Sequence, residues 1–552
     1  MTTNRGTHTM QLNLKDNSTE RRRLLLRVIA PAFPAFNIYS RFARRMTALG
    51  PICVATAAHE VEGWDVEVID ENNYREFAPS DEHGRPDHEA LQDIRPADVV
   101  GLYGGLTSTI PRLYEVANLY RNRGVPILAG GQHFCAENIQ DALDNGVDVI
   151  AIGEGELTIQ DILRRTQDQK PIDDVPGIAF LQDGRLVRTQ DRPPIVDFES
   201  MPLPDFSLLR NTRVKVYPLS WTRGCGMNCE FCTVKGKPRS SSPERLFRQV
   251  TSLVEKHNAR FFFIVDDLFG QHRTDALKFL SLVTAYQQKI STRLKFNVQI
   301  RLDKASDTEL LTAMKAAGVR TVCIGFESPI EEELVAMNKK LKPEEMIALA
   351  RIYHKFGFFV HGMFIFGYPL VGKAQFTMSE GERVRRFRKF ITAARIDTVQ
   401  VLLPVPLPCT KMTDRIVKAG RLYSRDHVGW EYYDGNFPCF EPDPPLSPEE
   451  LHRASMRIMG SFYRFRHMFT VAMHVLMFPS MVFSLHNLRS AWHQWYHGWR
   501  ISLIRFGGWV TIRRWLKEFK KGVFSKKLSD AKRVSIRPDE KGQENSASHL
   551  AN

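Results

Sequence analysis

Short apolar runs alternate with helical stretches of mixed polarity between Arg21 and about Arg165, a rhythm typical of an open parallel α/β sheet. Helices such as Pro111 to Arg123 and Ala136 to Asn145 fit the intervals between the runs. The runs predict five strands: Leu24 to Ala30, Asp65 to Asp70, Asp98 to Tyr103, Pro126 to Ala129 and Asp148 to Ile152.

Three of these strands end in glycine-rich turns. Ligands of open α/β sheets bind outside the carboxyl ends of the strands, and glycine lets the backbone approach a large flat ligand or its phosphate tail. Any one of these glycines is most simply part of a tight turn, but their repetition at one edge predicts a cofactor site. The expected cofactor-binding residues are Gly104, Gly105, Gly130, Gly131, Gly153, Glu154, Gly155 and Glu156.

A second alternating region begins after residues 166–215, which are rich in Pro and Asp and are typical of a linker. Its six βα steps fit a partial (β/α)6 TIM-like barrel over residues 216–410, whose chemistry should lie at the carboxyl ends of the strands. Ser242, Pro243 and Glu244 form a helix start signal within it. The predicted strands are Tyr217 to Thr222, Phe261 to Val265, Lys295 to Ile300, Thr321 to Phe326, Gly362 to Phe366 and Thr398 to Leu403.

The strand signal stops in the last quarter of the chain. Residues 411–525 are expected to form a helical, aromatic and basic region, and the polar residues 526–552 a disordered tail. Phe469 to Leu485 is strongly apolar, but it contains His474 and Pro479 and is shorter than the roughly 20 residues of a membrane-spanning helix. We therefore expect no membrane span there.

The formal net charge is +14, and the positive charges are concentrated late in the chain. Between Arg500 and Lys527 the only acidic residue is Glu518, and from Trp492 to Phe519 aromatic and basic residues interleave. The bland interpretation, which carries the most weight, is that the apolar helix face docks on the barrel while Arg and Lys stay solvated. The same pattern is found in helices that lie on an anionic lipid surface, so a peripheral membrane contact is the next interpretation, and nucleic-acid binding is a weaker one.

Composition restricts the class of protein. Hydrophobic residues make up 43% and charged residues 25% of the chain, which indicates a globular protein. Eight cysteines in 552 residues are too few for a disulfide scaffold, and the polar start of the chain carries no apolar signal segment. We expect a cytoplasmic protein that touches a membrane at most peripherally.

Cys225, Cys229 and Cys232 directly follow the first predicted barrel strand. Thiolates at this spacing can converge on one iron-sulfur cluster, and soft sulfur ligands suit iron. A structural zinc site needs four ligands, usually from two cysteine pairs, and no second pair with this spacing occurs. Three ligands for a 4Fe-4S cluster leave one iron open. That iron can chelate the amino and carboxylate groups of S-adenosylmethionine (SAM), whose reductive cleavage yields an adenosyl radical.

This arrangement resembles the radical SAM superfamily over Val216 to Pro408, and Phe231 stands where that family carries an aromatic residue. The resemblance implies that Asp266 and Asp267 lie near the SAM amino group and that Glu327 binds the ribose. The plainer interpretations are that the two acids cap a helix and that Glu327 belongs to a structural ion pair.

The resemblance implies two further SAM contacts. Gly367, in the segment Gly362 to Pro369, would lie near the adenine. The plainer interpretation is that a glycine at this position only relieves crowding. Arg301 would hold the SAM carboxylate, or could simply pair with Asp303.

A flavodoxin-like (Rossmann-like) domain ahead of such a barrel resembles the cobalamin-binding branch of the superfamily. That branch includes methylases of unactivated carbon and the anaerobic cyclase of chlorophyll biosynthesis. The resemblance covers about Arg21 to Arg165 and is carried by the glycine turns. Many cobalamin domains supply a histidine to cobalt from the first βα loop, but Ala30 to Ile38 contains none. We therefore expect cobalamin without a histidine lower ligand, and interpret His133 as a polar loop residue.

The resemblance implies an enzyme that uses a 4Fe-4S cluster, SAM and cobalamin to methylate an unactivated carbon. Radical cyclisation or oxidation without methyl transfer is the alternative. It also implies an electron donor such as a flavodoxin or ferredoxin and a small-molecule substrate, which the aromatic tail suggests is apolar or lipid-like. Cys409 is interpreted as a packed thiol rather than a hydrogen donor to the substrate. The cysteines outside the motif show no ligand-like grouping: Cys53, Cys135, Cys323, Cys409 and Cys439.

Overall fold

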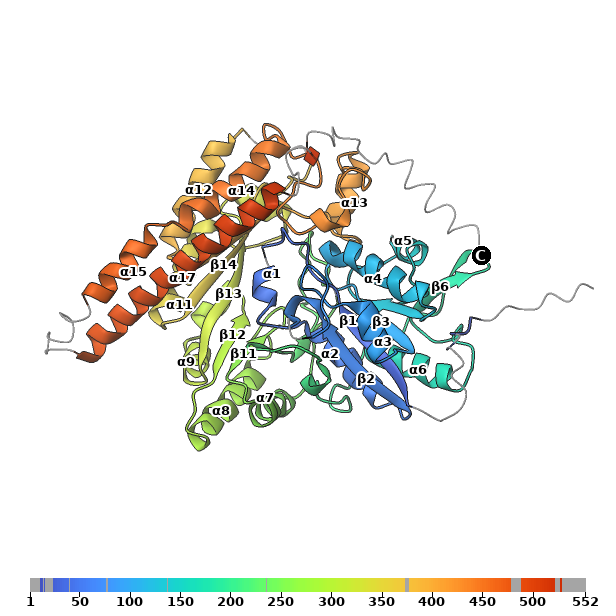
Figure 1. Ribbon diagram of the computed structural model, residues 1–552. Coiled ribbons are helices and arrows are strands. Elements are labelled where there is room, and N and C mark those ends of the chain that lie inside the picture. Colours follow the sequence, from blue (N-terminus) through green and yellow to red (C-terminus); the bar gives the residue numbers. More distant parts are fainter. Residues whose placement is uncertain are drawn as a thin grey trace, which may run out of the picture.

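The computed structural model describes residues 10–12, 14, 23–38, 40–75, 78–136, 138–234, 236–372, 377–477, 488–521 and 527–528. Two parallel sheets with helices on their faces stand side by side, and a group of long helices covers one end of the second sheet (Figure 1). The expected order of an α/β domain, a partial barrel and a helical region is confirmed.

The first sheet has the strand order β2-β1-β3-β4-β5-β6-β7. Its first five strands are parallel, as predicted, and differ from the predicted bounds by at most two residues at either end. Because β2 and β3 lie on opposite sides of β1, the strand order reverses there, which opens a crevice at the carboxyl ends. The bounds are β1 (Leu24–Ala30), β2 (Trp64–Asp70), β3 (Val99–Tyr103), β4 (Ile127–Gly130) and β5 (Val149–Ala151).

Helices cover both faces of this sheet. Alternate residues of β1 point to opposite faces, so Leu26 packs with α2 and α6 while Leu25 packs with α3, α4 and α5. The helix bounds are α1 (Ser40–Ala43), α2 (Leu49–His59), α3 (His88–Ile94), α4 (Ile110–Asn122), α5 (Ile139–Asp144) and α6 (Gly155–Gln167).

The expected linker is partly sheet. Within residues 166–215, β6 (Ile178–Gln182) and β7 (Arg185–Arg188) extend the first sheet as an antiparallel hairpin on β5. Ile178 and Phe180 are buried on β6, whereas most of β7 is exposed. The linker interpretation is therefore wrong for these strands, because an edge hairpin this short shows too few alternating residues to stand out in the sequence.

The second sheet has six parallel strands in the order β15-β14-β13-β12-β11-β8, the partial barrel that was predicted. Along β13 the buried Val322, Ile324 and Phe326 alternate with the half-exposed Cys323 and Gly325, which places the second set on the inner, concave face. The bounds are β8 (Tyr217–Leu219), β11 (Phe261–Ile264), β12 (Lys295–Gln299), β13 (Val319–Glu327), β14 (Phe359–Ile365) and β15 (Thr398–Leu402).

Helices pack on the outside of this barrel. The first of them begins as predicted, because the Ser242 hydroxyl accepts the backbone N–H of Arg245 and Pro243 occupies the first turn. The helix bounds are α7 (Pro243–His257), α8 (Arg273–Lys289), α9 (Thr308–Ala316), α10 (Glu331–Ala336), α11 (Pro343–Lys355) and α12 (Glu380–Ala393).

The C-terminal region is helical, as expected. Helix α13 (Lys411–Lys418) precedes α14 (Pro448–Phe462), which packs on β15 and α12. Helices α15 (His467–Leu476) and α17 (Leu488–Lys521) lie side by side and extend away from the barrel (Figure 1). Among the described helices, none is long and apolar enough to cross a membrane. Most of the tail expected to be disordered, residues 529–552, lies outside the described residues.

Candidate active site

The three motif cysteines lie on a loop closed by a short hairpin, which we call the cysteine loop (residues 224–238). Strand β9 (Thr222–Arg223) enters it and β10 (Arg239–Ser240) leaves it, and the two strands pair antiparallel. The predicted strand Tyr217 to Thr222 is thus divided between the barrel and this hairpin. Cys225, Cys229 and Cys232 are half-buried and belong to no disulfide of the described chain.

Burial and neighbouring carboxylate charge disfavour the thiolate form of two of these residues, Cys225 and Cys232. The pKa of Cys225 and that of Cys232 are raised, first by burial and further by the charge of Asp267. In the described part of the chain no three His, Cys, Asp or Glu side chains converge on a single-ion site. The thiolates of a 4Fe-4S cluster each bind a different iron, so their donor set differs from that of one ion.

Glu230 fixes the middle of the cysteine loop to the rest of the barrel. Arg415, on α13, forms a bidentate ion pair with its carboxylate at 2.8 Å for both contacts, and the Tyr368 hydroxyl donates to it at 2.7 Å. The Tyr368 ring also meets the Phe231 ring edge to face at 6.0 Å. The predicted aromatic residue of the motif is therefore part of a clamp that orients the loop.

The two adjacent acids at the end of β11 differ in environment. Asp266 is buried, and its Oδ1 accepts the backbone N–H of Trp221 at 2.7 Å, so it joins β11 to the strand before the cysteine loop. Burial raises the pKa of Asp266 to about 7. Asp267 is half-buried and lies within electrostatic range of Cys225 and Cys232. Of the pair, Asp267 is the one near the expected cluster.

Glu327 forms the ion pair that its plainer interpretation anticipated. Lys339 Nζ lies 3.0 Å from Glu327 Oε1, and the carboxylate lies over Gly325, where an added Cβ would be 2.4 Å from that oxygen. The pKa of Lys339 is raised despite burial, because Glu327 and the Cys229 and Cys225 sulfurs stabilise its charge. Lys339 thus joins the end of β13 to the cysteine loop.

Arg301 and Gly367 follow β12 and β14, so they lie at the carboxyl edge of the barrel. Arg301 pairs with Asp303 at 2.7 Å and also contacts the Met227 sulfur in the cysteine loop at 3.2 Å. Gly367 has a φ of 78°, which favours glycine, and an added Cβ would lie 2.1 Å from the Leu451 side chain of α14. The observed role of Gly367 is therefore a sharp turn under α14.

The glycine turns of the first sheet meet at the crevice beside β3. Gly131 has a φ of 136°, and a Cβ there would lie 2.5 Å from the backbone carbon of Gly104, so the two turns touch backbone to backbone. Gly130 and Gly105 complete these turns, and Gly153 has open space around it. The turns also pack tightly on two aromatic rings, because an added Cβ would lie 2.3 Å from the Phe134 ring at Gly104 and 2.0 Å from the Tyr103 ring at Gly105.

Glu154 and Glu156 hold the two domains together. Arg239, on β10, forms a bidentate pair with Glu154 at 2.8 and 3.0 Å, and Arg223, on β9, pairs with Glu156. Gly155, between the acids, begins α6 and would meet Val54 at 3.2 Å if it carried a Cβ. The hairpin that closes the cysteine loop is therefore attached directly to the glycine edge of the first sheet.

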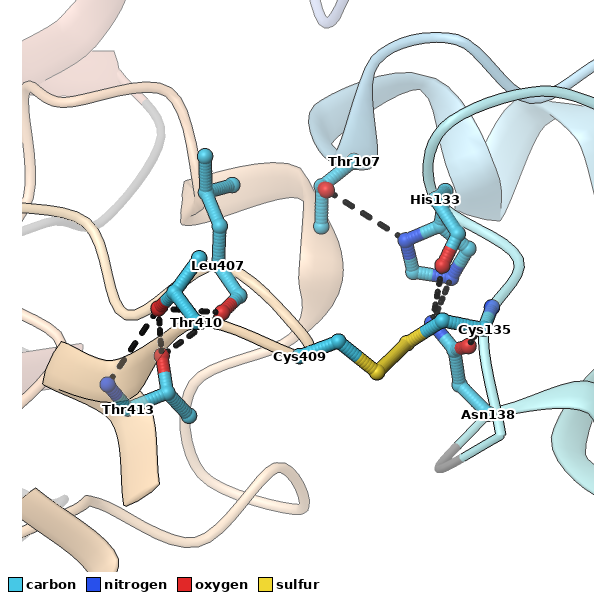
Figure 2. The surroundings of a disulfide bond; sticks show 8 residues. All are labelled: Thr107, His133, Cys135, Asn138, Leu407, Cys409, Thr410 and Thr413. Carbon is cyan, nitrogen blue, oxygen red and sulfur yellow. Dashed lines mark hydrogen bonds between the residues drawn. A yellow bond between two sulfur atoms is a disulfide. The ribbon is translucent and has the colours of Figure 1, made fainter. Parts of the chain in front are cut away.

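A disulfide joins the two domains a second time. Cys135, in the loop after β4, is bonded to Cys409, in the loop after β15, with a Cα–Cα distance of 6.6 Å (Figure 2). The interpretation of Cys409 as a packed thiol is wrong, because its sulfur is bonded to Cys135. Sequence spacing could not reveal this pair, because the two cysteines are 274 residues apart.

Next to the disulfide, the two ring nitrogens of His133 face Thr107 and Asn138, and burial lowers the histidine pKa to about 3 (Figure 2). The ring also packs against Trp430 at 4.9 Å. His133 is thus a packed polar residue, in agreement with its interpretation from the sequence.

A cavity of about 230 Å³ opens beside β15, between α14, α17 and the loop after β1. Its lining carries no ionised side chain, because burial lowers the pKa of His361 and the other lining groups are apolar or neutral. His361, on β14, meets Thr398 at 2.9 Å and Gln400 at 3.4 Å on β15, and Asn436, Tyr463 and Thr511 add neutral polar groups elsewhere on the wall. The apolar members are Ile38, Val399, Leu402, Met459 and Ile512.

Two protein-family models match these two regions. The B12 binding domain matches residues 40–163, and the radical SAM superfamily matches residues 219–377. The chain therefore carries a B12-binding domain followed by a radical SAM domain. Its cofactors are accordingly a 4Fe-4S cluster, SAM and cobalamin, and the chain is an enzyme whose relatives include methylases and a cyclase.

Three curated relatives are 24–26% identical to this chain over the aligned residues. An uncharacterised methyltransferase of Pyrococcus horikoshii is 26% identical over 66% of this chain and 78% of its own. The hopanoid C-2 methylase of Rhodopseudomonas palustris is 24% identical over 67% and 64%. The anaerobic magnesium-protoporphyrin IX monomethyl ester cyclase of Rubrivivax gelatinosus is 24% identical over 50% and 52%.

Two solved structures show the same fold. The radical SAM methyltransferase TsrM from Kitasatospora setae, with cobalamin and a [4Fe-4S] cluster bound, superposes with a TM-score of 0.58 at 18% identity, covering 72% of this chain and 78% of that one. The cobalamin-dependent SAM radical enzyme OxsB superposes with a TM-score of 0.60 at 14% identity, covering 93% and 83%. The similarity extends over both cofactor domains.

Three residues of this radical SAM site were missed in the sequence. Lys339 follows a short helix, and Arg415 and Tyr368 come from segments 185 and 138 residues from Glu230. Tyr368 falls within the segment Gly362 to Pro369 but was not singled out there, and Lys339 and Arg415 lie outside the motifs, where a charged residue is common. Only a pattern of paired acids and bases, such as Glu327 with Lys339, would have offered a signal.

Proposed function

We propose that this protein is a cobalamin-dependent methylase of an unactivated carbon in an apolar substrate. The observation that carries the proposal is the direct attachment of the cysteine loop to the glycine edge. Arg223 and Arg239 flank the loop, and their partners are Glu156 in the first turn of α6 and Glu154 just before that helix. A cluster in the loop and a cobalamin at the edge would therefore share one space between the two sheets.

The donor set of the cysteine loop fits a cluster, and the open backbone at Gly153 fits a large group that approaches the glycine edge. Cys225, Cys229 and Cys232 would hold three irons, while cobalamin would lie against the backbone of the glycine edge, where Gly153 leaves open space. When bound, the cluster supplies the electron that cleaves SAM, and cobalamin supplies a transferable methyl group. An external donor such as a flavodoxin or ferredoxin would deliver that electron.

The polar side chains around the loop would position SAM. Asp267 offers a carboxylate to the SAM ammonium group beside the cysteines, and Glu327 offers acceptors to the ribose hydroxyls while Lys339 holds its orientation. Arg301, paired with Asp303, keeps donors free for the SAM carboxylate. Asp266 acts through the backbone of Trp221 and is a positioning residue.

The uncharged cavity beside β15 supports an apolar substrate. Its walls come from Met459 of α14 and Ile512 of α17, and its floor is the edge strand. Burying an uncharged hydrocarbon against these side chains is favourable, whereas a charged group there would lose its hydration without a partner. A peripheral contact of the C-terminal helices with a membrane would bring the cavity close to such a molecule.

The test is anaerobic reconstitution with iron, sulfide, cobalamin and methyl-labelled SAM. We expect the wild-type protein to retain cobalamin, show a cluster spectrum and transfer label to an apolar extract of the source cells. Cys229→Ala should lose the cluster and SAM cleavage, whereas the control Cys53→Ala, at a cysteine outside the motif, should keep both. SAM cleavage that persists in Cys229→Ala would contradict the assigned site.

The names of the cyclase relatives supply a second candidate, a radical cyclisation or oxidation without methyl transfer. It predicts SAM cleavage and substrate conversion with no label in the product. Labelled product distinguishes the two reactions.

A further inference from the structure

A cationic cleft lies on the opposite edge of the barrel from the cysteine loop. It has a volume of about 810 Å³ and is bordered by α11, α12, α14, α15 and α17 at the amino end of β15. We call it the arginine cleft. Its five arginines are Arg388, Arg395, Arg464, Arg466 and Arg505.

These arginines are poorly neutralised. Arg505 donates to the backbone carbonyls of Ile396 and Asp397, and Arg464 donates to that of Ser461. Within the described ranges, none of the five guanidinium groups forms an ion pair with a carboxylate. The single acid of the lining, Asp397, accepts the backbone N–H of Val360 at 2.8 Å.

The neighbouring groups respond to this positive charge. Burial lowers the pKa of His467, and the charges of Arg505, Arg466 and Arg464 lower it further. The pKa of Arg505 itself is lowered by burial, although Asp397 opposes the shift. A concave surface with several arginines and little counter-charge attracts an anion, and guanidinium groups match the geometry of phosphate oxygens.

The helix beside the cleft carries an exposed apolar face. No side chain of α15 is buried, and Phe469, Met473 and Leu476 are 59%, 53% and 71% exposed. Large apolar side chains at this exposure rarely cluster on a monomer without a binding partner. Arg466 immediately precedes α15, so the cationic and apolar surfaces are continuous.

We propose that the arginine cleft and the apolar face of α15 together form a docking site for an anionic phospholipid membrane. The phosphate of a headgroup enters the cleft, and Phe469, Met473 and Leu476 lie in the acyl boundary. Cationic residues beside an apolar helix face are the chemistry that such an interface selects. The proposal rests on the membrane contact of the proposed function and locates it, but it does not depend on which reaction the enzyme catalyses.

The test is flotation of the reconstituted full-length protein with two kinds of vesicle. One contains phosphatidylglycerol and phosphatidylcholine at about 3:7, and the other contains phosphatidylcholine alone. The variant Arg464→Gln/Arg466→Gln is compared with Arg385→Gln/Lys389→Gln, which removes the same charge from α12 outside the cleft. We expect binding to the anionic vesicles only, weakened at least tenfold by the cleft variant and less than twofold by the control.

A second variant and two alternative ligands complete the design. Phe469→Ser/Met473→Ser should also weaken flotation at least tenfold, while SAM cleavage and thermal unfolding stay as in the wild type. Equal losses in the cleft and control variants would overturn the proposal, because net charge alone would explain binding. Cleft-dependent binding of inorganic pyrophosphate or of a single-stranded RNA, without vesicle binding, would overturn it in favour of a soluble anion or a nucleic acid.

Discussion

Cys135 and Cys409 are joined across the interface between the cobalamin domain and the radical SAM barrel, one at the carboxyl edge of each sheet. The bond lies beside the buried His133 and Asn138 (Figure 2). The two cofactor domains are therefore held together covalently as well as by the ion pairs of Glu154 and Glu156.

Loss of this bond should loosen the interface. A cross-link over a separation of 274 residues restricts the unfolded chain strongly, so Cys409→Ser should lower the free energy of unfolding by up to about 5 kcal/mol. Thermal unfolding of the holoenzyme measures this. A thiol reductant should lower the melting temperature of the wild type and leave that of Cys409→Ser unchanged. A reductant effect of equal size in both proteins would show that the two sulfurs are not bonded.

Removal of Lys339 should weaken SAM binding. Lys339→Met leaves the Glu327 carboxylate without its partner at 3.0 Å, so the carboxylate would lose its fixed orientation. We expect the KM for SAM to rise about tenfold, with a smaller change in kcat, because a half-buried charge is left uncompensated. Lys340→Met, at the adjacent exposed position, is the matched control and should behave like the wild type.

Asp266 should make stability depend on pH. Its folded pKa is raised from 3.8 to about 7, so the folded state binds this proton more tightly than the unfolded state. The stability contribution is fully present below pH about 4 and is lost as pH rises through about 7. Asp266→Asn keeps an acceptor for Trp221 N–H and removes the titration. Relative to the wild type, this variant should therefore gain stability between pH 5 and pH 8 in denaturant unfolding.

Filling the cavity beside β15 should separate substrate binding from SAM cleavage. Thr511 lies on α17 at the cavity wall, and Thr511→Trp would occupy the space without touching the cysteine loop. We expect methyl transfer to fall at least tenfold while SAM cleavage without substrate is unchanged. Thr511→Val, which keeps the volume, is the control. Unimpaired methyl transfer in Thr511→Trp would exclude this cavity as the substrate site.

Much of the fold followed from local patterns. The parallel strands of both sheets were predicted to within a few residues, because buried parallel strands are continuous apolar runs ended by turn residues. The hairpin of β6 and β7 was missed, since β7 is exposed over most of its length and its side chains show no apolar pattern. Helix α7 was predicted from its capping residues, which act over a single turn.

The sequence by itself determined the cysteine spacing, the order of the two cofactor domains and the position of the glycine turns, because each depends on residues that are neighbours in the chain. The tertiary structure decided which side chains meet. It placed Asp266 and Asp267 in different environments and paired Glu154 and Glu156 with arginines. It also brought Cys135 into contact with Cys409. These contacts join segments up to hundreds of residues apart, and packing of the two sheets, rather than any local preference, brings them together.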